Sequence, residues 1–320
     1  MRAILLNHHR LNWDNALDLS ALEREIDLSI REETSPDEIV DAARGFDVLI
    51  TKEVQVPAAT LRELGKSSVR LICEAGTGYN NIDLSAAADA GIRVCNVPQY
   101  STAAVAQLTM SFLLGVASRT KSYSERQARG DRSDFAGAPE SPVELEGKTL
   151  GVVGAGDIGS RVVAHARAFG MRVLTFNRKP RTWSLEEVHS VPLHELLERS
   201  DFITLHCPLV ELGPDATRHL IASETLSLMK PTAWLINTAR GGFVNEIDLI
   251  AALREGRIAG ACLDVQDPEP PGAQSPLWDL AQITPHAGWK ALEARQRLMD
   301  RIASNIKGFR DGNLLNEVSS

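Results

Sequence analysis

Short apolar runs alternate along the whole chain with stretches in which apolar residues recur every three or four positions. The runs predict buried strands and the stretches predict helices. Strands that alternate with helices are typical of parallel sheets with helices on both faces. The expected strands are 3–6, 47–51, 69–75, 92–96, 150–153, 172–176, 201–206, 233–238, 259–265 and 281–284, and the expected helices are 18–26, 36–44, 58–64, 84–90, 103–118, 158–170, 193–199, 222–230, 245–255 and 290–310.

Local signals mark where some of these elements begin and end. Ser35, Pro36 and Glu38 form the pattern of a capped helix start, with Ser35 as N-cap and Glu38 reaching back to it. Residues 130–142 are rich in turn-forming residues and predict a loop or an arm. At 320 residues the chain has the length of two domains of about 100–200 residues each.

The apolar helix at 103–118 raises the question of a membrane span. It is shorter than the roughly 20 residues that a bilayer requires. Gln107, Thr109 and Ser111 also interrupt it. A helix that is apolar on nearly all sides is explained more simply by burial between domains or subunits. We therefore expect no membrane partner.

Charge and cysteine content exclude other classes. The net charge is −8 and no long basic run occurs, so a nucleic-acid partner is not expected. Cys73, Cys95, Cys207 and Cys262 show no CxxC spacing and lie in apolar runs. They predict reduced core residues, no metal site and a cytoplasmic location. The first ten residues carry too few apolar positions for a secretion signal.

A glycine motif follows the strand at 150–153 directly and is itself followed by a helix and a second strand. This is the context of the dinucleotide-binding fingerprint. Gly154 permits a sharp turn, Gly156 lets a pyrophosphate approach the backbone, and Gly159 lets the helix lie close to the strand. The start of the helix then presents N–H groups and the positive end of its dipole to the phosphates. On this reading the carboxylate of Asp157 has to turn outward.

The end of the second strand of this unit distinguishes NAD from NADP. An acidic residue there would bind the ribose hydroxyls and repel a 2′-phosphate. The chain instead continues Asn177-Arg178-Lys179-Pro180-Arg181, with three cations and no acid. Charge-assisted hydrogen bonds to phosphate favour NADP(H), with NAD as a possible second cofactor. The alternative is that these are solvated surface cations.

Three loops that follow predicted strands of the second half carry an arginine, a carboxylate and a histidine: Arg240, Glu269 and His286. Ligands of such sheets lie beyond the carboxyl ends of the strands, so the three side chains are expected to face one crevice. In the first half, Gly76-Thr77-Gly78 follows a strand and has backbone N–H groups that suit an anion. An ordinary loop is the alternative there.

Taken together, the motifs resemble the D-isomer-specific 2-hydroxyacid dehydrogenase family over nearly the whole chain. The motifs are GTGYNNID (76–83), the glycine fingerprint, LHCPL (205–209), NTARGG (237–242), DVQDPEP (264–270) and PHAGW (285–289). Within the family, Ile50-Thr51-Lys52 and Trp289 make the chain most similar to glycerate dehydrogenases and hydroxypyruvate (glyoxylate) reductases. Two departures are a longer loop at 210–217 and Gln107, which stands where an acid is common.

The resemblance implies an α/β architecture of two Rossmann-like, doubly wound parallel-sheet domains with an active-site cleft between them. Residues 1–98 and 289–320 would form a flavodoxin-like substrate domain. Residues 99–288 would form the dinucleotide-binding domain, including a dimerisation helix and arm. A homodimer is the assembly that the family implies.

The resemblance also implies the reaction, the reduction of a small 2-keto acid to the D-2-hydroxy acid, and the residues that perform it. The implied catalytic residues are Arg240, Glu269 and His286, and the implied substrate-binding residues are Lys52, Thr77, Gly78, Arg240 and Trp289. The implied cofactor-binding residues are Thr102, Gly154, Gly156, Asp157, Ile158, Gly159, Asn177, Arg178, Lys179, Cys207, Pro208, Thr217, Thr238, Ala239, Arg240, Asp264, His286 and Gly288.

Several alternatives stay open. The substrate can be of the D-lactate, phosphoglycerate or erythronate phosphate type. Formate is disfavoured, because formate enzymes carry a glutamine where Glu269 stands. A non-catalytic, NAD(P)-sensing protein that resembles the family's corepressors is the alternative from another class, and the intact trio of Arg240, Glu269 and His286 argues against it.

Overall fold

The computed structural model describes residues 1–137, 141–179 and 182–319. Contacts divide the chain into two compact units, one of Met1–Ser101 with Trp289–Ser320 and one of Thr102–Gly288. The first boundary lies three residues beyond the expected one at 98/99. The physical reason is that the last helix holds residues 98–101 in the first unit: Arg301 donates to the carbonyl of Pro98, and Arg297 Nε donates to the carbonyl of Tyr100 at 2.9 Å.

The first unit contains a sheet of strand order β13-β5-β4-β3-β1-β2. The five strands β1 to β5 are parallel, in the 2-1-3-4-5 order that is typical of flavodoxin-like folds, and β13 joins the edge antiparallel to β5. The strands are β1 (Arg2–Leu5), β2 (Asp27–Ile30), β3 (Val48–Thr51), β4 (Leu71–Glu74), β5 (Arg93–Cys95) and β13 (Glu317–Val318). The sequence patterns did not predict β2, which has no fully buried residue, or the two-residue β13.

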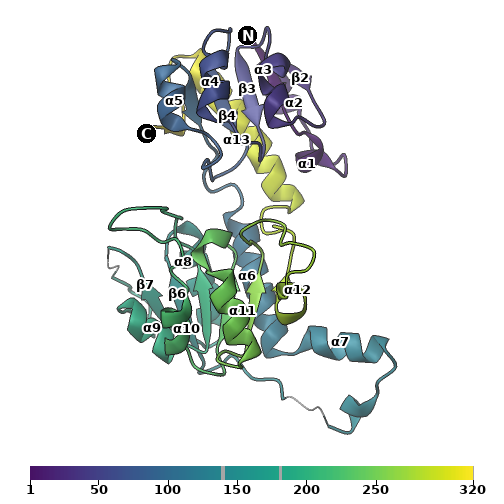
Figure 1. Ribbon diagram of the computed structural model, residues 1–320, viewed down its shortest axis with the longest axis vertical. Helices are drawn as coiled ribbons and strands as arrows, with labels where there is room; N and C mark the ends of the chain where they lie inside the picture. The colour runs from purple at the N-terminus through teal and green to yellow at the C-terminus, as the bar shows by residue number, and fades with distance from the viewer. Residues whose placement is uncertain (138–140, 180–181, 320) are drawn as a thin grey trace. The chain divides into compact units, whose positions relative to one another are not determined.

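Helices cover both faces of this sheet (Figure 1). Helices α3 to α5 bury their apolar residues against Ile4, Leu49, Ile72 and Val94. Helix α13 contacts β4 and also packs on α2. The helices are α1 (His9–Asn12), α2 (Ser20–Glu23), η1 (Pro36–Glu38), α3 (Ile39–Ala42), α4 (Ala58–Leu64), α5 (Leu84–Asp89) and α13 (Leu292–Arg310). The predicted cap is confirmed, because the Ser35 backbone N–H donates to Glu38 Oε2 at 2.8 Å.

The second unit contains a seven-stranded parallel sheet of order β12-β11-β10-β9-β6-β7-β8. This is a doubly wound dinucleotide-binding topology with β6 at the switch point, so the predicted fold class is confirmed. The sequence predicted six of these strands and missed β8, in which only Val188 is buried. The strands are β6 (Thr149–Val153), β7 (Arg172–Phe176), β8 (Val188–Ser190), β9 (Phe202–Leu205), β10 (Trp234–Asn237), β11 (Gly260–Leu263) and β12 (Gln282–Ile283).

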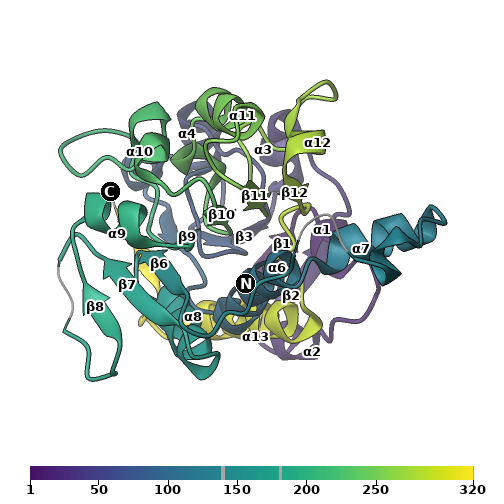
Figure 2. The same cartoon turned by 90° about the horizontal axis from the view of Figure 1, so that it is seen from below.

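Two helical layers enclose this second sheet. Helices α6 and α8 pack on one face, where Leu150, Val152 and Ile236 are buried. Helices α9 to α12 contribute to the core on the other face (Figure 2). The helices are α6 (Thr102–Ala117), α7 (Thr120–Ala128), η2 (Ser133–Phe135), α8 (Asp157–Ala168), α9 (Leu193–Arg199), α10 (Ser223–Leu228), η3 (Gly241–Phe243), α11 (Glu246–Arg254) and α12 (Leu277–Leu280).

Like β8 and α12, helix α7 was not predicted by the apolar pattern. None of its residues is buried, and it projects away from the sheet in both views (Figures 1 and 2). The predicted arm at 130–142 contains η2, and its residues 138–140 lie outside the described ranges. Among the described residues no helix is long and apolar enough to span a membrane, α6 included.

The cysteines are free, as predicted, and Cys73, Cys95 and Cys262 are buried. Cys207 is the exception to the predicted core burial, because it lies half-buried in the turn that follows β9. In the described ranges no cluster of histidine, cysteine or acidic side chains has the arrangement of a metal site.

His206 is a titratable group in the interior of the second unit. Its Nε2 lies 2.9 Å from Thr204 Oγ1, and its buried Nδ1 has no hydrogen-bond partner among the described residues. Burial lowers the pKa of His206 to about 3. A half-buried, neutral imidazole with a buried Nδ1 thus lies at the carboxyl end of β9.

This burial predicts a contribution to acid sensitivity. The pKa in the folded state lies below the unfolded value of about 6.5, so the neutral ring stabilises the fold above that pH, and the contribution is lost as the pH falls toward 3. We expect the stability advantage of the wild type over His206→Gln to shrink by about 2 kcal/mol between pH 7.5 and pH 5.0. Urea denaturation at the two pH values measures it. The control is the exposed His194→Gln, and an equal shift in both variants would contradict the assignment to His206.

Candidate active site

The glycine turn between β6 and α8 has the shape that a pyrophosphate requires. Gly154 has a φ of +94°, and a Cβ there would lie 2.5 Å from the backbone nitrogen of Cys207. A Cβ on Gly159 would overlap the carbonyl oxygen of Gly154. A Cβ on Gly156, in contrast, would meet no atom within 4 Å. The turn is therefore closed on the protein side and open at the N-cap of α8, where an anion fits.

The residues beyond β7 were predicted to form the adenosine side of this site. Asn177 Oδ1 accepts a hydrogen bond from the backbone N–H of Ala155 at 3.2 Å, so the amide that replaces the acid also holds the glycine turn. Arg178 forms an ion pair of 2.9 Å with Asp215, which belongs to the unusually long loop at 210–217. Asp157 is exposed, as the outward orientation expected for it requires. Lys179 is exposed as well, and Arg181 lies outside the described residues.

Arg240, Glu269 and His286 follow three adjacent strands. Strands β10, β11 and β12 are neighbouring and parallel, so the loops that follow them leave the same edge of the sheet. Arg240 donates from Nη1 to the carbonyl of Ala239 at 2.7 Å, and its own carbonyl accepts from Asn237 Nδ2 at 2.8 Å. A Cβ on Gly241 would overlap the carbonyl of Gln266, so the arginine loop lies directly against the loop that carries Glu269.

The structure brings the histidine and the glutamate together. His286 Nδ1 lies 2.9 Å from Glu269 Oε1, and the two side chains are 32% and 36% exposed. This bond orients the imidazole and directs Nε2 away from the carboxylate. His286 has a φ of 47°, a left-handed conformation that is costly for a residue with a side chain.

The conformation of this histidine depends on Asp264, which is 1% exposed. Its carbonyl accepts the N–H of His286 at 2.9 Å. Its carboxylate accepts the Thr284 hydroxyl at 2.5 Å, the Ala287 N–H at 2.6 Å and the Gly288 N–H at 2.9 Å. The family resemblance implied only a cofactor contact for Asp264. The structure also shows a structural role, because both carboxylate oxygens accept hydrogen bonds from the loop that contains His286.

The first unit contains the loop that was predicted to receive an anion. Thr77 is exposed and Gly78 half-exposed, while the Thr77 carbonyl accepts from Asn96 Nδ2 at 2.7 Å and the Thr77 hydroxyl donates to the Val97 carbonyl at 3.0 Å. Glu74, which the sequence reasoning did not single out, lies beneath the loop and is 2% exposed. It accepts from Thr51 at 2.7 Å and from Asn81 at 3.0 Å. Burial raises the pKa of Glu74.

The remaining predicted cofactor residues lie in the second unit, most of them where its strands end. Cys207 and Pro208 follow β9, and Thr238 and Ala239 follow β10. Thr238 Oγ1 lies 3.0 Å from Thr109 Oγ1, a buried polar contact that the sequence did not reveal. Thr217 uses its hydroxyl within its own loop, donating to the Pro208 carbonyl at 2.9 Å. Thr102 and Ile158 lie in the first turns of α6 and α8, and Gly288 ends the unit.

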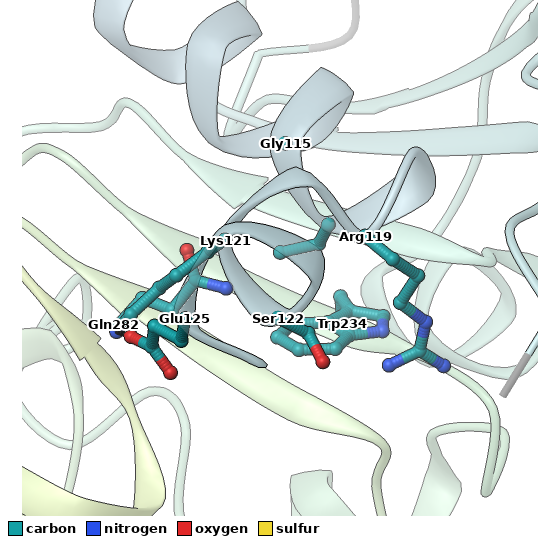
Figure 3. Close-up of a pocket in the computed structure, with 8 residues that line it drawn as sticks. Gly115, Arg119, Lys121, Ser122, Glu125, Trp234 and Gln282 are labelled. Carbon is teal, nitrogen blue, oxygen red and sulfur yellow. Dashed lines mark ion pairs between the residues drawn. The ribbon is translucent and has the colours of Figure 1, made fainter. Parts of the chain in front are cut away.

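A separate hollow of about 190 Å³ lies at the amino ends of the strands, opposite the carboxyl ends that carry the predicted site (Figure 3). Trp234 and Gln282, the first residues of β10 and β12, contribute to its walls. Arg119 and Lys121, from the junction of α6 and α7, complete them together with Glu125. No residue of the predicted site lines this hollow, because the site belongs to the carboxyl ends of the strands.

The fold, the glycine turn and the His–Glu pair define a dinucleotide-dependent oxidoreductase. Comparison with known proteins narrows the class. Residues 110–288 match the family model of the D-isomer specific 2-hydroxyacid dehydrogenase, NAD binding domain. The chain belongs to this family of NAD-dependent dehydrogenases.

Individual relatives agree with this result. The chain is 32% identical to a hydroxypyruvate reductase of Blautia hydrogenotrophica over 328 aligned positions, which cover 100% of both proteins. It is 36% identical over 310 positions to a D-3-phosphoglycerate dehydrogenase of Methanocaldococcus jannaschii, covering 94% of this chain but 56% of that protein. Among solved structures, an acyclic imino acid reductase in complex with NADPH and D-Arg has a TM-score of 0.83 at 27% identity, covering 99% of both chains.

The role of Asp264 in shaping the histidine loop gives a prediction. In Asp264→Asn an amide N–H replaces one carboxylate oxygen and faces backbone N–H groups, so the loop has to move. We expect kcat/KM for a keto acid to fall by about 100-fold, the loss that a small displacement of a reacting group produces. Steady-state oxidation of reduced cofactor measures it.

The matched control is Asp267→Asn, whose carboxylate forms an ion pair of 2.8 Å with Arg218 in the neighbouring loop. We expect this variant to stay within about threefold of the wild type, since exposed ion pairs contribute little. Equal losses in the two variants would contradict the specific role of Asp264.

Proposed function

We propose that this chain reduces a small 2-keto acid of the hydroxypyruvate or glyoxylate type to the D-2-hydroxy acid, and that it uses NADPH in preference to NADH. The observation that carries this proposal is the 2.9 Å pair of His286 and Glu269, on the same sheet edge as Arg240 and the glycine turn. The hydroxypyruvate reductase with which the chain aligns over its whole length supports the substrate class.

In the proposed reaction Arg240 binds the keto acid. A guanidinium has donors in a fork, so it reaches both the carboxylate and the keto oxygen and polarises the carbonyl. The backbone N–H groups of Thr77 and Gly78 receive the rest of the carboxylate. Bound reduced nicotinamide supplies the hydride. The residues of the chain orient the keto acid and balance the charge that develops on its oxygen.

His286 provides the proton. Its Nε2 donates to the oxygen that becomes an alkoxide, and in the reverse direction it accepts that proton. Glu269, whose Oε1 lies 2.9 Å from Nδ1, orients the imidazole and places a carboxylate beside it. A non-catalytic, cofactor-sensing protein would not need a histidine paired with a carboxylate. The pair therefore favours an enzyme over that alternative.

The preference for NADPH rests on Asn177 and Arg178. An amide in place of the acid removes the repulsion of a 2′-phosphate, and Arg178 is the nearest cation along the chain. Its ion pair with Asp215 is 65% and 52% exposed, so a phosphate can compete for the guanidinium. The NADPH in the solved acyclic imino acid reductase shows that this fold accommodates the phosphorylated cofactor in a relative.

We further propose a cytoplasmic homodimer. The projecting helix α7, which has no buried residue in the isolated chain, supports a role as an arm that another subunit covers. Analytical ultracentrifugation of the purified protein measures the assembly directly.

The catalytic assignment predicts the effect of two substitutions. In His286→Ala the proton donor is missing, and in Arg240→Ala the cation that orients and polarises the carbonyl is missing. We expect kcat/KM for hydroxypyruvate to fall by at least about 100-fold in each. Unchanged dissociation constants for NADPH, measured by fluorescence titration, would separate chemistry from cofactor binding. Turnover near the wild-type rate in either variant would end the assignment.

The cofactor assignment predicts opposite effects for the two partners of one ion pair. We expect Arg178→Ala to weaken kcat/KM for NADPH by about tenfold and to change kcat/KM for NADH by less than twofold, since one charge-assisted hydrogen bond is lost. Asp215→Asn releases Arg178 and is expected to improve the use of NADPH. Parallel changes with NADPH and NADH would contradict the role of Arg178.

A further inference from the structure

Lys52 is a buried cation at a strand end of the first unit. It follows β3 directly and is 3% exposed. Its Nζ forms an ion pair of 2.8 Å with Glu53 and lies 3.7 Å from the centre of the Trp289 ring. A lysine is rarely buried unless it is paired, and here one carboxylate and one aromatic face provide the pairing. The ammonium group has three donors, so it retains donor capacity toward a further oxygen.

Trp289 adds a second donor beside Lys52. Its side chain is 5% exposed, and the buried indole Nε1 has no hydrogen-bond partner among the described residues. A buried indole N–H normally has an acceptor, because a buried donor without one loses its hydrogen bond to water and gains none in return. The unsatisfied N–H therefore indicates that an acceptor from outside the chain belongs there.

The indole of Trp289 packs against an aromatic neighbour. Trp13 packs edge-on against it, with ring centres 6.2 Å apart and an angle of 77°. Arg295 stacks over Trp13 at 4.0 Å and donates to both carboxylate oxygens of Asp14. Arg295 Nε also donates to the carbonyl of Lys290, the residue after Trp289, at 3.0 Å. The indole ring thus contacts Trp13, and Arg295 binds both the Trp13 side of this cluster and the backbone of the residue that follows Trp289.

Lys52 is also close to the loop that is proposed to receive the substrate carboxylate. Strands β3 and β4 are paired, and the N–H of Ala75 donates to the carbonyl of Thr51 at 2.7 Å. Lys52 and Gly76 therefore follow neighbouring strands about 4.8 Å apart. This spacing suits one small molecule whose carboxylate lies on the Thr77-Gly78 loop and whose other end reaches Lys52.

We propose that Lys52 Nζ and Trp289 Nε1 form a subsite for the C3 hydroxyl of a three-carbon keto acid, which makes hydroxypyruvate the preferred substrate over pyruvate and glyoxylate. The inference rests on the proposed function and deepens it. Both side chains are donors, so the ligand atom is an oxygen acceptor. Glu53 already balances the charge of Lys52, and its carboxylate repels a phosphate, so the subsite disfavours the phosphorylated analogue.

The test compares two substrates that differ only in this hydroxyl. For wild type, Trp289→Phe and Lys52→Met, kcat/KM is measured with hydroxypyruvate, pyruvate, glyoxylate and 3-phosphohydroxypyruvate. Trp289→Phe keeps an aromatic face for Lys52 and removes only the N–H donor. We expect the ratio of kcat/KM for hydroxypyruvate to that for pyruvate to fall about tenfold in Trp289→Phe, and further in Lys52→Met, where the lost bond is charge-assisted.

The control is Trp13→Phe, which touches the same indole but carries neither donor of the subsite. We expect it to leave the substrate ratio within twofold of the wild type. A ratio that is unchanged in Trp289→Phe while the wild type reduces keto acids would overturn the subsite and leave the proposed function standing. A wild type that reduces none of the keto acids would overturn both. Preference of the wild type for the phosphorylated substrate would also overturn the subsite.

Discussion

The chemistry of this protein depends on one buried carboxylate, that of Asp264. It lies directly after β11 and accepts hydrogen bonds from three groups of the loop that follows β12. These bonds stabilise a loop in which His286 has a positive φ, a conformation that costs on the order of 1–3 kcal/mol for a residue with a side chain. The imidazole meets Glu269 only because the backbone is held in this way. The imidazole that is proposed as the proton donor is therefore positioned by a carboxylate that directly follows the neighbouring strand β11.

The first unit also contains a buried carboxylate at a strand end that binds the loop beyond it. Glu74, at the end of β4, is 2% exposed and accepts hydrogen bonds from the end of β3 and from Asn81 in its own loop. Glu53, nearby on the β3 side, also has a positive φ of 52°. In both units a buried acid at a strand end orders the loop on which a ligand is proposed to bind. Burial of the acid is costly, and several directed N–H and O–H donors offset that cost.

The sequence revealed what depends on periodicity and short motifs. Strand β6 is buried at all five positions, so its apolar run was unambiguous, and the strand-end motifs led to Arg240, Glu269 and His286. Elements with few buried residues were not predicted, because they lack an apolar pattern. Strands β2 and β8 are largely exposed, and helix α7 has no buried residue. The loop-ordering roles of Asp264 and Glu74 could not be predicted from the sequence, for a different reason. A carboxylate that binds backbone N–H groups leaves no pattern in side-chain chemistry, because every residue except proline has such a group.

The same reasoning explains why substrate selection is harder to read from sequence than the reaction itself. Keto-acid reduction requires a cation for the carboxylate and a proton donor for the developing alkoxide, and few residue types supply these, so such residues recur in motifs. A hydroxyl of the substrate needs only some donor in the right place, and lysine, tryptophan or a backbone amide would each serve. What distinguishes Trp289 is the absence of an acceptor for its buried N–H in the described part of the chain, on a ring that packs against Trp13. Selectivity of this kind arises from a donor that the fold leaves unsatisfied, since an analogue without the hydroxyl then leaves that donor without a partner in the complex.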